Sequence, residues 1–164
     1  MVRKSSFPPI ADARARLLVL GSLPGDRSLA EARYYAHPQN QFWALMSPVA
    51  GCDLTALDYD VRLVALRDAR IAVWDVIASA HRPGSTDAAI ADLRANDLPA
   101  VIATLPDLRA VAFNGGTALR HGREALGALA ARLAVVALPS SSPLHTVGLA
   151  AKQPAWRALR EWTV

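Results

Sequence analysis

The chain has 164 residues and a mass of 17.5 kDa, enough for one globular domain with a sizeable core and too little for two ordinary ones. We therefore expect a single domain over residues 1–164. Hydrophobic residues make up 52% of the chain and charged residues 20%, a balance that excludes collagen-like, low-complexity and wholly disordered proteins. Lysine and arginine outnumber aspartate and glutamate by 18 to 14, and this net charge of +4 permits a polyanionic partner.

Residues of the types that usually bind metal ions are scarce in this sequence. Cys52 is the only cysteine, which excludes an internal disulfide, a cysteine-based zinc site and a four-thiolate iron–sulfur cluster. The four histidines are scattered, and no H-E-x-x-H helix is present, so we expect no metal and no cofactor. Residues 1–12 hold no apolar stretch long enough for a signal peptide or membrane helix, so we expect a cytoplasmic protein without a membrane partner.

Short apolar runs alternate with helical patterns along the chain. A capping box of Ser28 and Glu31 predicts the start of a short helix that runs through Ala32. The spacing of apolar residues indicates further helices at 42–49, 61–65, 90–93, 98–105 and 119–132, and a last helix that includes 156–162. The four expected strands are the apolar runs 17–20, 71–77, 110–113 and 133–138.

This alternation predicts a three-layer α/β/α sandwich with a central, mainly parallel sheet of about four strands. Parallel strands need crossover connections, and these connections place helices on both faces of the sheet. Open sheets of this kind bind ligands at the carboxyl ends of their strands, where each expected strand here leads into a polar or glycine-rich loop. We therefore expect the functional site to lie across those loops.

Familiar catalytic motifs do not explain these loops. The segment 21–25, Gly-Ser-Leu-Pro-Gly, lacks the spacing of a dinucleotide-binding fingerprint and the lysine of a P-loop, and it can equally serve only to shape a turn. The serines at 140–142 precede His145, but no G-x-S-x-G elbow surrounds any serine. The sequence therefore gives little support to a nucleotide cofactor or a serine nucleophile.

Two polar residues follow buried strands and leave two interpretations open. Asp75 interrupts an otherwise apolar run, so its carboxylate either caps a helix or faces a partner or a polar cavity. Asn114 precedes two glycines, which suits a strained turn as well as an amide directed at a ligand. The segment 34–43 gathers aromatics, amides and an imidazole, and its aromatic residues suit core anchors as well as a binding site.

The order of three loops resembles the uracil-DNA glycosylase superfamily, most closely its hypoxanthine-DNA glycosylase branch. These loops are 21–25 (Gly-Ser-Leu-Pro-Gly), 34–43 with its His-Pro-Gln-Asn-Gln-Phe-Trp, and 142–145 (Ser-Pro-Leu-His), and the resemblance spans nearly the whole chain. It implies a monofunctional enzyme that flips a deaminated base out of DNA and hydrolyses its N-glycosidic bond. Such chemistry needs a positioned water and a stabilised departing base, and requires neither a metal nor a covalent nucleophile.

The resemblance also implies roles for individual residues. In mismatch-specific relatives an asparagine of the first loop positions the water, but Leu23 stands at that place here, so we assign the water to Asn40. Asp75 matches in position the strand-end asparagine with which the classical uracil enzymes read their base, and we place it with Asn40 among the catalytic residues. The residues expected to bind the base are Ser22, Leu23, Phe42 and Asn114, with Phe42 stacking on the flipped base.

The last of the three loops is similar to the minor-groove loop of the superfamily. There a serine contacts a phosphate and a leucine wedges into the vacated base stack, roles that fall here on Ser142 and Leu144. Ser140 stands where classical enzymes carry a histidine, which His145 could replace. The residues expected to contact DNA are Ser141, Ser142, Pro143, Leu144 and His145.

The expected partner is therefore DNA that contains deaminated bases, bound by a monomer. Three alternatives stay open from the sequence: excision of uracil from mismatches, a catalytically silent nucleic-acid-binding module, and a small-molecule hydrolase at the strand ends. Each predicts a different result. Faster release of uracil than of hypoxanthine would indicate the uracil enzyme, binding without base release would indicate the binding module, and no DNA binding would indicate the small-molecule hydrolase.

Overall fold

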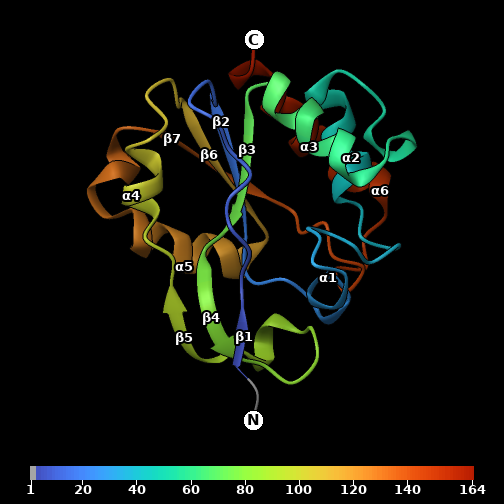
Figure 1. The fold of residues 1–164 in the computed structure, drawn as a ribbon, viewed down its shortest axis with the longest axis vertical. Helices are drawn as coiled ribbons and strands as arrows, with labels where there is room; N and C mark the ends of the chain where they lie inside the picture. Colours follow the sequence, from blue (N-terminus) through green and yellow to red (C-terminus); the bar gives the residue numbers. More distant parts are fainter. Residues whose placement is uncertain (1–2) are drawn as a thin grey trace.

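The computed structural model describes residues 3–164 and has a four-stranded parallel sheet at its centre (Figure 1). The strands lie in the order β3-β2-β6-β7. Helices α4 and α5 lie on one side of this sheet, and α2, α3 and α6 lie on the other, which confirms the three-layer α/β/α arrangement. The strands of this sheet are β2 (Leu17–Gly21), β3 (Ile71–Asp75), β6 (Ala110–Asn114) and β7 (Ala134–Leu138).

The helices agree well with the apolar periodicity of the sequence. Gly51 ends α2 with a left-handed backbone (φ 78°), and the side chain of Asp97 caps α4 by accepting a hydrogen bond from the Ala100 N–H at 3.1 Å. The α-helices are α1 (Asp26–Glu31), α2 (Phe42–Ala50), α3 (Tyr59–Asp68), α4 (Leu98–Ile102), α5 (Gly116–Leu126) and α6 (Leu149–Arg157). Short 3-10 helices are η1 (Leu54–Ala56), η2 (Asp87–Ala89), η3 (Gly127–Ala131) and η4 (Ala158–Trp162).

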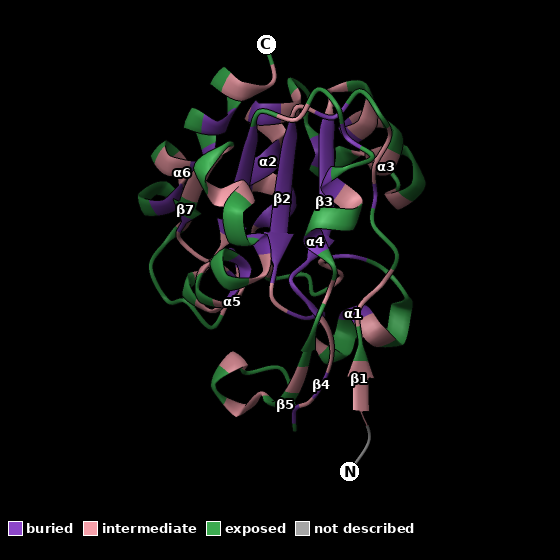
Figure 2. Ribbon diagram, turned by 90° about the vertical axis from the view of Figure 1, so that its left-hand side faces the viewer, coloured by how far each residue is buried: buried purple, intermediate pink, exposed green. Residues whose placement is uncertain are grey.

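The register of the sheet sets where the site can form. Gly21 pairs with Asp75, and Asn114 pairs with Leu138, so the ends of all four strands lie along one edge. The residues of β2 and β3 are buried on both faces, because each strand is covered by helices as well as by its neighbours (Figure 2). Polar side chains on these strands therefore occur at the carboxyl edge, where the helical layers end.

A second, smaller sheet corrects two expectations. It is antiparallel, in the order β1-β4-β5, and it lies beyond the carboxyl edge of the main sheet (Figures 1 and 2). The apolar run 71–77 is thus not one strand, and the residues around 90–93 form a strand, not a helix. The strands of this sheet are β1 (Arg3–Ser5), β4 (Ile77–His81) and β5 (Ala91–Ala95).

The backbone around Val76 explains the division of that run. Its N–H donates to the carbonyl of Gly21 at 2.8 Å, and its carbonyl accepts from the N–H of Asn96 at 2.8 Å. At this residue the chain therefore stops pairing with β2 and begins to pair with β5. Ile77 then packs with Leu23 in a small cluster separate from the main core, so the apolar run continues without a break across two sheets.

The expected capping box at Ser28 is also wrong in detail. Helix α1 starts at Asp26 with Gly25 as its N-cap, so Ser28 lies inside the helix. The Ser28 side chain is buried, and its Oγ accepts a hydrogen bond from the N–H of Ala36 at 3.1 Å. It therefore fastens the segment after α1 to the helix.

Two other expectations concern the chain as a whole. No helix within residues 3–164 is both long enough and apolar enough to cross a membrane. The assignment of residues 1–164 to one domain stays a prediction, and its first two residues lie outside the part of the chain that the structure describes.

Close packing between α5 and β6 gives a test of this fold. A Cβ atom at Gly122 would lie 2.0 Å from Cε1 of Phe113, a buried side chain of the core. Gly122→Ala should therefore lower the free energy of unfolding by about 1–3 kcal/mol, although alanine is the better helix former. Denaturant unfolding measures this change.

Gly116→Ala is the matched control, because Gly116 lies in the same helix and a Cβ there would meet nothing within 4 Å. It should leave the free energy of unfolding unchanged or raise it by up to about 1 kcal/mol. Equal stability of the two variants would show that α5 does not approach β6 as closely as described.

Candidate active site

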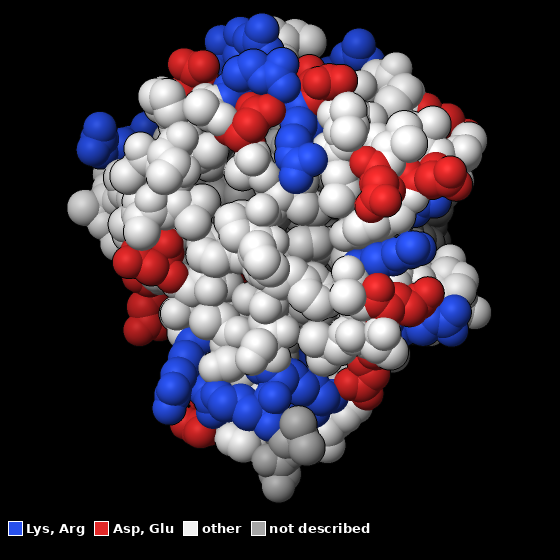
Figure 3. Space-filling view, in the orientation of Figure 1, with Lys and Arg blue, Asp and Glu red and all other residues white. Residues whose placement is uncertain are grey.

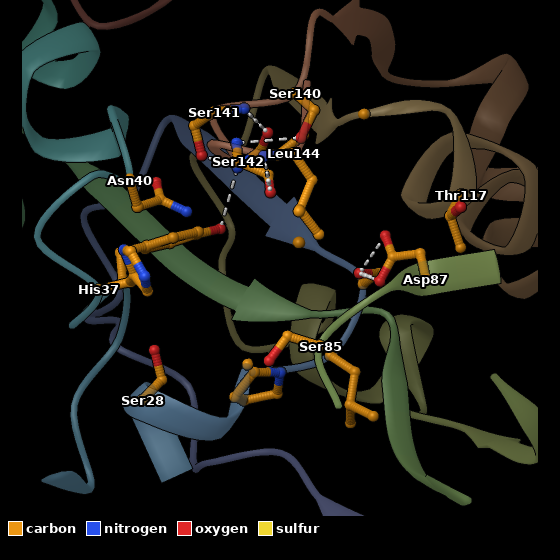
Figure 4. A pocket seen from close by; sticks show the side chains of 18 of the residues that line it. Ser28, His37, Asn40, Ser85, Asp87, Thr117, Ser140, Ser141, Ser142 and Leu144 are labelled. Carbon is orange, nitrogen blue, oxygen red and sulfur yellow. Dashed lines mark hydrogen bonds between the residues drawn. The ribbon is translucent and has the colours of Figure 1, made fainter. Parts of the chain in front are cut away.

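One pocket of about 500 Å³ opens at the carboxyl edge of the parallel sheet. This size is typical of small-molecule sites, which span roughly 300–1,000 Å³. Figure 4 shows Asn40 and His37 on one side of the pocket, Asp87 and Thr117 on the opposite side, and residues of the serine loop (140–145) between them. The lining comes from Asp75 and from the segments 21–28, 34–40, 85–88, 114–117 and 140–145.

The sequence predicted this gathering of loops well. All the candidate residues except one line the same pocket, although they come from five separate segments of the chain. The residues that line it are Ser22, Leu23, Asn40, Asp75, Asn114, Ser141, Ser142, Pro143, Leu144 and His145.

Phe42 is the exception, because its side chain is fully buried and is not part of the lining. The ring of Tyr35 stacks on it, with centroids 3.8 Å apart and planes 8° from parallel. Tyr35 lines the pocket, so the aromatic surface available to a planar ligand belongs to Tyr35 and not to Phe42. We expected Phe42 itself to stack on the base, whereas the ring that lies between it and the pocket is that of Tyr35.

Asn40 presents an amide at the rim of the pocket just before α2 begins. Its Oδ1 accepts a hydrogen bond from the N–H of Phe42 at 3.0 Å, and its own N–H donates to the carbonyl of His37 at 2.9 Å. The first bond fixes the direction of the side chain, and the second holds the backbone that carries it. An amide oxygen has a second lone pair, so Asn40 can still accept a hydrogen bond from a water or a ligand.

Asp75 places a buried carboxyl group at the end of β3. The residue is 3% exposed, and its Oδ2 has no hydrogen-bond partner within residues 3–164. A Cβ at Gly21 would lie 2.7 Å from its Oδ1 and 2.8 Å from the hydroxyl of Tyr35, so only glycine leaves room for both groups. A buried oxygen without a partner is costly, and one that lines a pocket is suited to bind a polar ligand.

The surroundings of Asp75 favour its neutral form. Burial, together with the negative charge of Asp87, raises the pKa of this carboxyl to about 7, although Arg82 opposes the shift. Near neutral pH the group is therefore present in both protonation states. In the neutral state it offers one O–H donor and one carbonyl acceptor.

A buried arginine, which sequence reasoning missed, fastens the first loop of the pocket. Arg82 is 1% exposed and donates to the carbonyls of Leu23 and Pro24, and to that of Gly84 at 3.1 Å. It also lies 3.4 Å from a carboxylate oxygen of Asp87. Arg82 therefore holds the loop after β2 against the loop after β4.

Asp87 completes this connection from the pocket side. The hydroxyl of Ser22 lies 2.9 Å from each of its carboxylate oxygens. Neither Arg82 nor Asp87 stood out in the sequence, because their roles depend on the small antiparallel sheet. The only signal was the run of turn residues at 83–86 after a strand.

The amide of Asn114 is occupied by protein partners. Its Nδ2 donates to the hydroxyl of Tyr35 at 3.3 Å and to Oγ of Ser141 at 2.9 Å, while its Oδ1 accepts from the N–H of Ser141 at 2.9 Å. Both amide hydrogens are thus used. In this arrangement Asn114 therefore has no free amide hydrogen to donate to the edge of a base, which was the role expected of it.

The serine loop holds its own shape by short-range hydrogen bonds. Oγ of Ser142 accepts from the N–H of Leu144 at 3.1 Å, and Oγ of Ser140 accepts from the N–H of Ser142 at 3.1 Å. The buried ammonium of Lys152 lies 3.4 Å from the carbonyl of Ser142, and burial lowers its pKa. Leu144 is 62% exposed at the tip, where its side chain is free to contact a partner.

Positive charge does not cover the face seen in Figure 3 evenly. Lysine and arginine side chains gather at the end near β1 and at the opposite end near the C-terminus, with uncharged surface at the centre of the face and charges of both signs along its right-hand edge. At the β1 end, Arg3 pairs with Asp92 at 2.9 Å and Lys4 pairs with Asp26. Within residues 3–164 no group of three or more histidine, cysteine, aspartate or glutamate side chains is placed to hold a metal ion.

Fold and site together define an α/β/α protein that can take a planar polar ring into a pocket at the carboxyl edge of its sheet. The model of the Uracil DNA glycosylase superfamily matches residues 8–160. The chain therefore belongs to this superfamily, as the three loops indicated.

Individual relatives agree with this assignment. The chain is 40% identical over 114 residues to a Hypoxanthine DNA glycosylase of Methanosarcina barkeri, a match that covers 70% of this chain and 72% of that protein. A protein of the same name from Methanosarcina acetivorans is 38% identical over 112 residues, with coverage of 68% and 71%. The solution structure of a candidate uracil DNA glycosylase from M. acetivorans superimposes with a TM-score of 0.85 at 34% identity and covers 97% of both chains.

The buried carboxyl of Asp75 gives a prediction on stability. In the unfolded chain this group ionises near pH 4, whereas in the folded protein it ionises near pH 7. The folded state therefore becomes less stable relative to the unfolded state as the pH rises from about 4 to about 7, because in that range the Asp75 carboxyl ionises freely only in the unfolded chain. Asp75→Asn removes this loss, so the variant should gain stability relative to the wild type between pH 5 and pH 8.

Denaturant unfolding at both pH values measures the difference. Asp107→Asn is the control, because Asp107 is exposed and takes part in none of the ion pairs within residues 3–164, so the stability difference from the wild type should be nearly the same at both pH values. A gap between Asp75→Asn and wild type that stays the same at both pH values would show that Asp75 ionises normally in the fold.

Proposed function

We propose that this protein is a DNA glycosylase that releases hypoxanthine from DNA and leaves an abasic site. The observation that carries the proposal is the pocket, in which an amide, a buried carboxyl and an aromatic ring converge beneath a loop with an exposed leucine. Two relatives that bear the name Hypoxanthine DNA glycosylase support the choice of base.

The base is held by one stacking contact and one polar contact. The ring of Tyr35, supported from behind by Phe42, provides the stacking surface. The neutral carboxyl of Asp75 complements the lactam of hypoxanthine, because its O–H donates to the base carbonyl while its C=O accepts from the neighbouring N–H. Uracil and xanthine carry the same N–H and C=O pair, so deaminated bases as a class fit this contact.

Bond cleavage then needs one water and a stabilised leaving group. The amide oxygen of Asn40 accepts a hydrogen bond from the water and directs its oxygen toward the anomeric carbon of the sugar. That oxygen forms the new bond to carbon, the electron pair of the glycosidic bond leaves with the base, and one proton of the water ends on the released base. The O–H of Asp75 stabilises the negative charge that develops on the base carbonyl.

The remaining parts of the proposal concern DNA and the assembly. Leu144 fills the space from which the base has been flipped, and the hydroxyl of Ser142 contacts a backbone phosphate. A monomer is the proposed assembly. DNA with deaminated bases is the partner, and the cytoplasm is the proposed compartment.

A direct assay tests the function. Purified protein is incubated with single- and double-stranded oligonucleotides that contain hypoxanthine, uracil or xanthine, and abasic sites are then cleaved with alkali. We expect strand cleavage with hypoxanthine. Cleavage with uracil alone would identify a uracil enzyme, and binding without cleavage would identify a nucleic-acid-binding module, so either result would overturn the proposal.

Asn40→Ala tests the source of the water. The single-turnover rate should fall roughly 100-fold or more, about the effect of losing one fixed polar group in a catalytic site, while affinity for damaged DNA changes little. Gln39→Ala is the control, because this neighbour is exposed and does not line the pocket. A near-wild-type rate for Asn40→Ala would place the water on another loop.

Leu144→Ala tests the wedge. The variant should lose activity on duplex DNA, because the flipped base returns more readily to the stack, and should lose much less on single strands. Val147→Ala is the control, because Val147 is 46% exposed nearby but does not line the pocket. The ratio of the duplex rate to the single-strand rate is the measured quantity, and an unchanged ratio would show that Leu144 is no wedge.

A further inference from the structure

We propose that Asn114 is a positioning residue that couples the loop of Leu144 to the loop of Asn40 through Ser141. This inference rests on the proposed function for the meaning of the two loops, but not for the contacts themselves. It assigns to Asn114 a role different from reading the base.

The contacts of Asn114 fix both its neighbours and its own side chain. It holds Ser141 twice, because its Oδ1 accepts from the Ser141 N–H and its Nδ2 donates to the Ser141 Oγ, each at 2.9 Å. The remaining amide hydrogen lies toward the hydroxyl of Tyr35, at an N–O distance of 3.3 Å. Since an asparagine amide has only two hydrogens, no donor is left for a base.

Ser141 carries the connection across to Asn40. It is 1% exposed, and its carbonyl accepts a hydrogen bond from the N–H of Gln41 at 2.9 Å. Gln41 directly follows Asn40 and is the N-cap of α2. A continuous chain of hydrogen bonds therefore runs from Asn114 at the end of β6, through Ser141, to the residue next to the proposed water-binding amide.

The other side of Ser141 leads to the wedge. Ser142 follows it directly, and Oγ of Ser142 accepts from the N–H of Leu144 at 3.1 Å. Figure 4 shows Ser141, Ser142 and Leu144 on the loop next to Asn40. The position of the wedge and the position of the amide are thus both set from one point, the rigid end of a central strand.

The coupling has a functional consequence. A glycosylase must release the base only when it is fully flipped, because a small displacement between water and sugar lowers the rate steeply. With Asn114 in place, the Leu144 loop can adopt its position on DNA only together with the correct register of Asn40. The hydroxyl of Tyr35 adds the stacking ring to the same unit.

Amide hydrogen exchange tests the coupling without any substrate. In Asn114→Ala the Ser141 N–H loses its acceptor and should exchange at least about 10-fold faster. The Gln41 N–H does not touch Asn114, yet it should also exchange faster because its acceptor, the Ser141 carbonyl, is no longer held. Faster exchange at Ser141 with unchanged exchange at Gln41 would overturn the coupling.

Asn114→Asp is the conservative variant that separates the two possible roles. A carboxylate can accept from the Ser141 N–H, and the hydroxyls of Ser141 and Tyr35 can turn to donate to it, so the connection is restored. A base reader would instead have its donor and acceptor pattern changed. Exchange at Gln41 should therefore recover in Asn114→Asp, and lack of recovery would contradict the proposed connection.

Kinetics give the second readout. Asn114→Ala should lower the single-turnover rate about 10- to 100-fold for hypoxanthine and uracil alike, so that the ratio between the two bases stays the same. Asn114→Asp should recover most of that rate. A changed ratio between the bases in either variant would show that Asn114 reads the base, and would overturn the proposal.

A second destabilised variant is the control for a general loss of stability. Leu119→Ala removes a half-buried side chain from α5 and should lower the free energy of unfolding without changing exchange at Gln41. Faster exchange at Gln41 in this control would attribute the effect to stability and overturn the coupling. If the wild type releases no base, the proposed function fails, whereas the exchange measurements still decide the coupling.

Discussion

The parallel pairing of β2, β3 and β6 is the constraint on which the rest of this protein depends. Because the three strands run in one direction, Gly21, Asp75 and Asn114 end at the same edge of the sheet. The strands themselves are buried on both faces, so polar groups on them are confined to that edge. The close approach of Asp75 and Tyr35 over Gly21 follows from this register, and it defines the floor of the pocket.

Asp75 is the residue whose burial in this arrangement is energetically unfavourable. Its carboxyl is desolvated, one of its oxygens has no partner within the described residues, and the charge of Asp87 lies nearby. Packing alone does not require such a group, and an apolar residue there would be more stable. A site that keeps an unfavourable polar group at the centre of a pocket is typical of binding and catalysis, where stability is given up for chemistry.

The sequence was sufficient for the parallel sheet and for most of the pocket. Apolar runs located its four strands, and the rule that ligands bind at the carboxyl edge brought Asn40, Asp75 and the serine loop together. The second sheet could not be predicted in the same way. The run 71–77 shows no break at Val76, and most residues of β5 are exposed, so no period marks it as a strand.

Side-chain direction was the other limit. Phe42 and Tyr35 lie in one aromatic segment, and only the full burial of Phe42 behind Tyr35 shows which of the two rings faces the pocket. Asn114 was placed correctly at the edge, but its partners Ser141 and Tyr35 are distant in sequence. The sequence did not indicate Arg82 and Asp87 either, since their contacts depend on the small sheet.

The pH dependence of base release from a single-stranded hypoxanthine oligonucleotide tests the central claim most directly, because a single strand removes the cost of opening a duplex. If the neutral carboxyl of Asp75 binds the base and supports its departure, the single-turnover rate of the wild type falls as the pH rises through about 7. Asp75→Asn, which keeps one donor and one acceptor, retains activity with no such fall. A wild-type rate that rises through the same range, together with an inactive Asp75→Asn, would contradict this account.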